Sequence, residues 1–137
     1  MNPKIFLVLL IILVFFFFLD FRLYSFDYGE NWYPEEKYGT VNFRWIPQIA
    51  TLYITNDAKL PQKVEMNFVA WSYNHNRELE IELGNSTTKL NVSQYPSTNK
   101  LVLNLRPGKN ILSFSSSECT IINSTCISIA IGNLYFS

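Results

Sequence analysis

Hydrophobic residues follow two different spacings along the chain. Residues 5–19 (IFLVLLIILVFFFFL) form an unbroken apolar run behind Lys4. From Thr40 onward, apolar and polar residues alternate instead, which is typical of strands that bury one face and expose the other. The pattern therefore predicts an N-terminal apolar helix followed by a β-rich domain.

About eight strands are predicted from this alternation. Turn-forming segments separate them, including 56–61, 74–77 (NHNR), 84–85 and 107–108. Short strands repeating about every ten residues are typical of an all-β fold, here an antiparallel β-sandwich of the jelly-roll or Greek-key kind. The expected strands are 41–45, 50–55, 64–73, 78–83, 87–92, 101–105, 109–115 and 127–136.

The apolar run predicts a membrane anchor, although it is short. About 15 helical residues cover roughly 22 Å of a hydrocarbon core that is about 30 Å thick. Phe21, Leu23, Tyr24 and Phe26 extend its apolar face, so a single span from about Ile5 to Tyr24 is expected. Two alternatives stay open: a cleaved secretory signal, although small residues are not spaced for cleavage, and a buried core helix.

Three regions follow from these patterns. Residues 1–24 are the expected signal anchor, residues 25–39 a juxtamembrane connector without strands, and residues 40–137 the β-sandwich. Nearly all of the polar sequence follows the anchor, so we expect a single-pass protein of the cell membrane with an extracytoplasmic C-terminal domain.

Composition narrows the expected partners. The chain has 11 basic and 11 acidic residues and no run of like charge, so the sequence gives no argument for nucleic acid or for an anionic surface as a partner. Aromatic residues make up 16% of the chain. Such residues either fill a β core or form a surface on which ligands stack.

The two cysteines, Cys119 and Cys126, predict a disulfide. They bracket a short segment before the last predicted strand, and an exported domain favours oxidised cysteines. Closing a loop of about eight residues stabilises a fold by roughly 2.5 kcal/mol in the chain-entropy model. A metal site would need further ligands, and His75 is the only histidine. We therefore expect no metal and no cofactor.

Three candidate N-glycosylation sequons begin at Asn85, Asn91 and Asn123. Their number is close to what chance gives for this composition. Asn85 and Asn123 lie in predicted turns, where a glycan is tolerated.

Catalytic chemistry has no clear basis in the sequence, and we expect no enzyme. A nucleophile needs a neighbouring base, and His75 lies in an asparagine-rich turn that is typical of a solvated loop. Glu78, Glu80 and Glu82 read as the polar face of a strand rather than as a glycosidase carboxylate pair.

Three motifs resemble a known kind of module. They are Trp32-Tyr33-Pro34-Glu35, Phe43-Arg44-Trp45 and the segment 101–110 (LVLNLRPGKN). In this order they resemble the extracytoplasmic β-sandwich that some archaeal and bacterial multi-pass membrane glycosyltransferases carry after their last span. This chain lacks the many spans and the acidic catalytic loop of those enzymes. The resemblance therefore implies a module that works beside glycans or a membrane glycosyltransferase, not transferase activity.

One strand face has the composition of a sugar-binding surface. Trp71 and Tyr73 share a face with Glu65 and Asn67, and rings flanked by amide and acidic groups can stack on sugars and bond their hydroxyls. The alternative is an ordinary outer sheet face. The expected carbohydrate-binding residues are Trp71, Tyr73, Asn74, His75 and Arg77.

The sequence also suggests structural roles. Core packing is expected for Trp32, Tyr33 and Trp45, together with a salt bridge between Arg44 and Glu35. The function expected overall is a non-enzymatic, membrane-anchored binding module for carbohydrate. The alternative is a subunit of a surface layer or filament that assembles through an unprotected final strand, 127–136.

Overall fold

The computed structural model describes residues 2–18 and 24–137. The first range holds helix α1 (Pro3–Phe18), whose apolar side chains from Ile5 to Phe15 are exposed. Within the described ranges, no helix combines the length and the hydropathy that crossing a membrane requires. Most of the predicted extension of the span, at 19–23, lies outside the described residues.

The predicted span does not extend through Tyr24. This residue begins strand β1 (Tyr24–Tyr28) and pairs with Asn56 of β4 (Ile49–Asn56). Tyr24 and Phe26 point the same way and pack on Phe136, with ring centroids 6.1 and 5.2 Å away. Their spacing of two therefore places them in a strand of the β domain, not on the face of a membrane helix.

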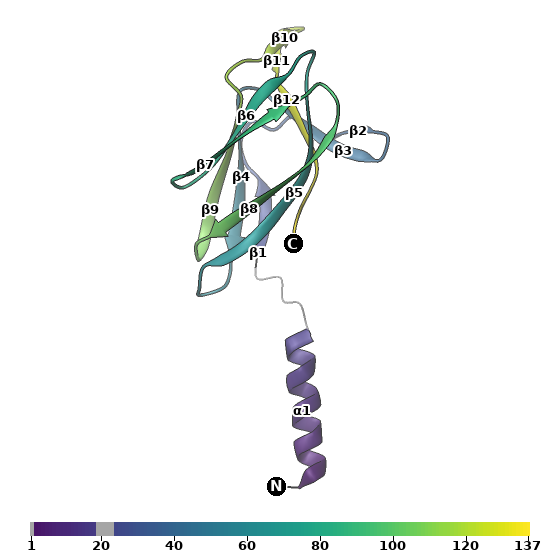
Figure 1. The fold of residues 1–137 in the computed structure, drawn as a ribbon, viewed down its shortest axis with the longest axis vertical. Helices are drawn as coiled ribbons and strands as arrows, with labels where there is room; N and C mark the ends of the chain where they lie inside the picture. Colours follow the sequence, from purple (N-terminus) through teal and green to yellow (C-terminus); the bar gives the residue numbers. More distant parts are fainter. Residues whose placement is uncertain (1, 19–23) are drawn as a thin grey trace.

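Two five-stranded antiparallel sheets form the domain (Figure 1). The first sheet has the order β1-β4-β9-β6-β7, and the second has the order β2-β3-β12-β5-β8. Their remaining strands are β9 (Gly108–Ser115), β6 (Arg77–Leu83), β7 (Ser86–Val92), β2 (Glu36–Tyr38), β3 (Val41–Ile46), β12 (Ile129–Phe136), β5 (Gln62–Ser72) and β8 (Ser97–Leu105).

The predicted antiparallel β-sandwich is confirmed. All eight expected strands occur, and β3-β12-β5-β8 facing β4-β9-β6-β7 is the connectivity of a jelly roll. The segment 25–39, expected to be a connector without strands, instead supplies most of β1 and all of β2, which lengthen the two sheets. These strands are too short to show a clear alternation in the sequence.

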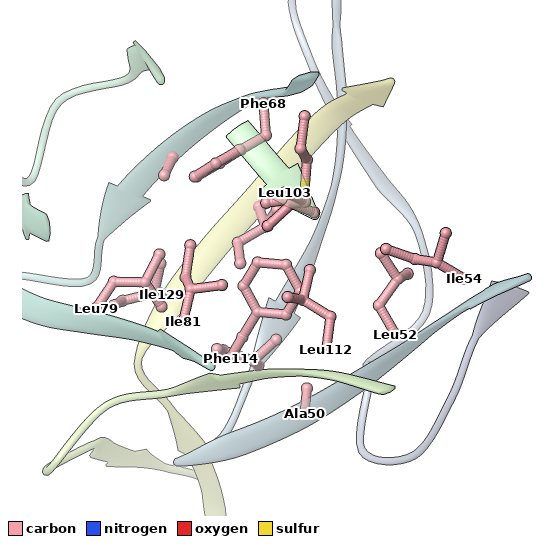
Figure 2. Close-up of a cluster of buried hydrophobic side chains, with 14 of the residues drawn as sticks. Ala50, Leu52, Ile54, Phe68, Leu79, Ile81, Leu103, Leu112, Phe114 and Ile129 are labelled. Atoms are coloured by element: carbon pink, nitrogen blue, oxygen red, sulfur yellow. The ribbon is translucent and has the colours of Figure 1, made fainter. Parts of the chain in front are cut away.

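The core lies between the two sheets, as Figure 2 shows for several labelled side chains. The inward-facing apolar residues of β4 and β5 are at most 4% exposed. Facing side chains from β6, β9 and β12 complete this layer. The buried members of β4 and β5 are Ala50, Leu52, Ile54, Val64, Met66, Phe68 and Ala70.

Strand β12 lies inside the second sheet, not at its edge. Ile129 pairs with Ile46 of β3 on one side and with Ser72 of β5 on the other. Along residues 129–132 a strand lies on each side, so the expectation of an unprotected final strand is wrong there, and filament assembly through these residues has no free edge to use. Beyond Gly132, β12 pairs with β5 through Tyr135 and Phe136.

The predicted disulfide is confirmed. Cys119 and Cys126 are bonded across a hairpin of β10 (Thr120–Ile122) and β11 (Thr125–Ile127), with their Cα atoms 5.5 Å apart. Figure 1 shows this hairpin at the end of the sandwich opposite the β8–β9 turn.

Candidate functional site

A cluster of aromatic rings covers part of the outward side of the second sheet. Directly paired residues of antiparallel strands lie on the same side of a sheet, and the pairs Ala130 with Trp45 and Ala130 with Trp71 place both tryptophans outward. We call this cluster the aromatic face; its members are Tyr38, Phe43, Trp45, Trp71 and Tyr73.

The rings pack edge to face. The Phe43 and Trp71 centroids are 4.6 Å apart, and Trp45 lies 5.8 Å from Tyr73 and 6.0 Å from Trp71. Trp45 is close to perpendicular to these neighbours, with interplanar angles of 75–76° to Trp71 and Tyr73 and 90° to Phe43. Such pairs stabilise one another beyond simple burial. The cluster is therefore a small second core on the outside of the sheet.

The members of the aromatic face differ in exposure. Phe43 is 6% exposed and Trp71 is 8% exposed, whereas Tyr38 is 68% exposed. Trp45 and Tyr73 are half-buried. Trp71 is thus mainly a support, and ring surface for a ligand comes from Tyr38, Trp45 and Tyr73.

Polar groups surround these rings on the same side of the sheet. Glu36 pairs with Phe43 and therefore lies beside it. Farther along β5, Asn67 pairs with Lys100, whose ammonium group lies 3.3 Å from the Glu65 carboxylate. Asn67 itself is only 4% exposed, so the accessible polar neighbours are carboxylate and ammonium groups. Exposed rings with such neighbours can contact the C–H faces and the hydroxyls of a sugar.

The loop at 74–76 borders the aromatic face, because it directly follows Tyr73. Asn74 is exposed and adopts a φ of 65°, a left-handed conformation that asparagine tolerates. The His75 Nε2 atom lies 2.7 Å from the Glu118 Oε1 atom. This hydrogen bond is the main reason that the pKa of Glu118 lies below its ordinary value of 4.5.

Arg77 was predicted to lie in a turn at 74–77, but it begins β6 and its side chain is only 1% exposed. Its guanidinium donates to the Ser72 hydroxyl at 2.9 Å and the Thr120 hydroxyl at 2.7 Å. It also donates to the carbonyl groups of Tyr73 and Ser128. Arg77 therefore joins β5, the disulfide hairpin and the start of β12, and a ligand cannot reach it.

The motif residues of the connector have structural roles. Trp32 packs on Phe114 with centroids 5.4 Å apart, and its Nε1 atom donates to the Thr51 carbonyl at 2.6 Å. The Tyr33 hydroxyl donates to the Cys126 carbonyl at 2.9 Å. These contacts agree with the expected packing of Trp32 and Tyr33, while Trp45 packs within the aromatic face.

Arg44 does not form the expected salt bridge with Glu35; within the described residues no such ion pair occurs. Its Nη1 atom donates to the Tyr33 carbonyl at 3.2 Å, and its guanidinium lies 4.5 Å from the Tyr28 ring centroid. Burial raises the pKa of Tyr28, and the Arg44 charge opposes that shift. Arg44 therefore holds the segment 25–39 against β3 through the Tyr33 carbonyl and the Tyr28 ring, not through the Glu35 carboxylate.

The three candidate glycosylation sites are accessible. Asn85, Asn91 and Asn123 are all exposed, so a glycan at each sequon would meet no packed side chain. Across 2–18 and 24–137, no three His, Cys, Asp or Glu side chains group as a metal site would require.

Sequence reasoning did not include Tyr38, Phe43 or Trp45 in the site. Phe43 and Trp45 alternate on β3 as Trp71 and Tyr73 do on and after β5. The sequence signal was present, but the pairing of β3 with β12, and of β12 with β5, is needed to place these rings together.

Comparisons with known proteins show similarity at the level of the fold. No protein-family model matches the chain, and no curated protein matches it. Among solved structures, the N-terminal cellulose-binding domain of Cellulomonas fimi β-1,4-glucanase C is similar, with a TM-score of 0.50 and 6% identity over 82% of this chain and 88% of that chain.

Two further solved structures have lower TM-scores. The module named Xyl-CBM35, in complex with a glucuronic acid-containing disaccharide, gives 0.48 at 12% identity, over 84% of this chain and 91% of that chain. A family 35 module from Cellvibrio japonicus gives 0.45 at 10% identity, over 83% and 96%. The likeness to the cellulose-binding domain shows a shared β-sandwich fold.

Proposed function

We propose that this protein is a non-enzymatic carbohydrate-binding module that holds a glycan on its aromatic face. The observation that carries the proposal is the gathering of Tyr38, Trp45 and Tyr73 on one outward sheet surface over buried Phe43 and Trp71. The likeness to a cellulose-binding domain supports the same conclusion at the level of fold.

The site is suited to weak binding. Two stacked rings contribute only a few kcal/mol before the costs of association, so we expect dissociation constants no tighter than roughly 0.1 to 1 mM. We further propose that the apolar N-terminal run attaches the domain to a membrane, where a glycan-handling enzyme such as a glycosyltransferase acts. Attachment near the glycan raises its effective concentration and compensates for weak affinity.

Titration of the full chain with soluble oligosaccharides tests the proposal. The protein is kept in a detergent without a sugar headgroup, and hexose, xylose and N-acetylglucosamine oligosaccharides are added while tryptophan fluorescence is followed. We expect a saturable change with at least one of them, because Trp45 and Trp71 both lie in the site.

Matched variants locate the response. Tyr38→Ala removes an exposed ring and should weaken binding by about tenfold, since stacking contributes roughly 1 kcal/mol or more. Tyr53→Ala, on the outward side of the first sheet, is the control and should bind like the parent. Absence of binding to every oligosaccharide, or equal affinity of the two variants, contradicts the proposal.

A further inference from the structure

The strand register gathers several turns at the end of the sandwich where the chain enters from α1. Tyr24 pairs with Asn56, and Asn56 pairs with Gly108. On the other sheet, Gln62 pairs with Leu105. The β4–β5 loop and the β8–β9 turn therefore lie beside the start of β1, as Figure 1 shows at the bottom of the sandwich.

This end of the sandwich is basic. Four exposed cations belong to it, against the one carboxylate of Asp57 in segments 56–63 and 104–110, so these segments carry a net charge of 4 − 1 = +3 in a chain whose net charge is zero. Lys89 and Lys100 form ion pairs elsewhere, whereas in the described part of the chain these four cations form none. We call Lys59, Lys63, Arg106 and Lys109 the basic end. The sequence alone offers no argument for an anionic partner because these cations are separated along the chain, and only strand pairing brings their segments together.

A groove at this end offers hydrogen-bond donors. It has a volume of about 500 Å³, and its lining includes Asn85, Asn104, Arg106 and Lys109. The Lys109 Nζ atom lies 3.9 Å from the Tyr53 ring centroid, which steadies the ammonium group at the rim. Guanidinium, ammonium and amide groups together suit the oxygens of a phosphate group.

The basic end also carries an exposed apolar tip. Leu60 follows Lys59 in the β4–β5 loop and is 73% exposed. An apolar side chain beside cations can enter the boundary between headgroups and acyl chains while the cations stay at phosphate depth. A free anionic polymer offers nothing to such a side chain, so the pattern favours a lipid surface.

We propose that the basic end docks on an anionic phospholipid surface, with Leu60 inserted at the interface and the cations on headgroup phosphates. The position of the apolar α1 supports this partner. Connectivity alone keeps the end of α1, at Phe18, within about 20 Å of Tyr24. The docking sets the sandwich upright on the surface, independently of whether the aromatic face binds glycan.

Hydrogen exchange of the full chain on vesicles tests this docking. The protein is incubated with vesicles of phosphatidylcholine alone, or of phosphatidylcholine with about one part in three phosphatidylglycerol. Exchange of the backbone amides of residues 57–61 should be at least about tenfold slower on the anionic vesicles, because each cation near an anionic leaflet strengthens binding about fivefold. About 0.5 M salt should remove the difference.

Variants that remove equal charge distinguish docking of the basic end from non-specific electrostatic attraction of the whole protein to anionic vesicles. Lys59→Gln with Lys63→Gln should abolish the protection, whereas Lys37→Gln with Lys89→Gln removes equal charge elsewhere and should retain it. Leu60→Ser, which keeps every charge, should reduce the protection at least threefold. Equal exchange on both kinds of vesicle, equal effects of the two lysine pairs, or equal protection by soluble polyphosphate would each overturn the proposal.

Discussion

Arg77 connects three parts of the fold through its buried guanidinium. Replacing it with methionine removes its hydrogen bonds to the Ser72 and Thr120 hydroxyls and to the Tyr73 and Ser128 carbonyls, although both carbonyls keep a backbone N–H donor. We predict that Arg77→Met lowers the free energy of unfolding by about 3–5 kcal/mol, measured by urea denaturation. Arg106→Met, at an exposed position, should change it by less than about 0.5 kcal/mol. Similar losses in both variants would remove the case for this network.

The side chains of His75 and Glu118 form a hydrogen bond between two exposed loops. Because the hydrogen bond from His75 lowers the pKa of Glu118, the contribution of this pair to stability is present above the ordinary carboxyl pKa of 4.5 and is lost as the pH falls through the lowered value. We predict that His75→Gln raises the Glu118 titration midpoint toward 4.5, as followed by NMR of the side-chain carboxyl carbon. Lys37→Gln, which is remote, should leave that midpoint unchanged.

Single residues of the site were only partly predictable. Alternation on β5 correctly placed Trp71 on the outward side of the sheet, but it could not show that Phe43 and Trp45 would cover that ring, because their contact depends on pairing through β12. Arg77 was misplaced because the NHNR segment looks like a turn throughout. Burial of an arginine depends on acceptors from distant segments, which no local pattern reports.

Gly132 sets the distance between two strands. A Cβ atom there would lie 2.7 Å from the Asn42 carbonyl oxygen and 2.9 Å from the Phe43 Cβ atom. We predict that Gly132→Ala lowers the free energy of unfolding by about 1–3 kcal/mol, since β3 or β12 must shift. The comparison is Gly39→Asn, where the φ of 60° tolerates asparagine and the added Cβ would meet nothing within 4 Å. A Gly132→Ala variant as stable as the parent would contradict this close packing.

Strands were predictable where alternation ran for five or more residues, and all eight of those form. The three-residue strands β2, β10 and β11 were missed because so few residues show no period. Strand β1 was missed for another reason, since its aromatic residues directly follow the apolar run and suit a membrane interface equally well. The position of β12 in its sheet depends on long-range pairing, and alternation does not distinguish a central strand from an edge.

Two of the four edge strands of the five-stranded sheets carry a lysine that can oppose pairing between molecules. These strands are β7 and β8, with Lys89 and Lys100 on their outward sides. We predict that Lys89→Val with Lys100→Val lowers the soluble fraction by about half on warming, measured by light scattering, because uncharged edges pair between molecules. Lys59→Val with Arg106→Val, which alters loop positions, should aggregate less. Equal scattering by both pairs would indicate that net charge, not edge protection, keeps the protein soluble.

The central position of β12 has a consequence for how the chain is made. Ile46 of β3 pairs with Ile129 of β12, so β3 acquires this neighbour only after almost the whole β domain has been synthesised. A nascent chain that stops short of Ile129 holds β3 and β5 without the strand that joins them. Such high contact order slows folding and keeps the emerging polypeptide open. The sandwich can close only when β12, the strand between β3 and β5, has been made.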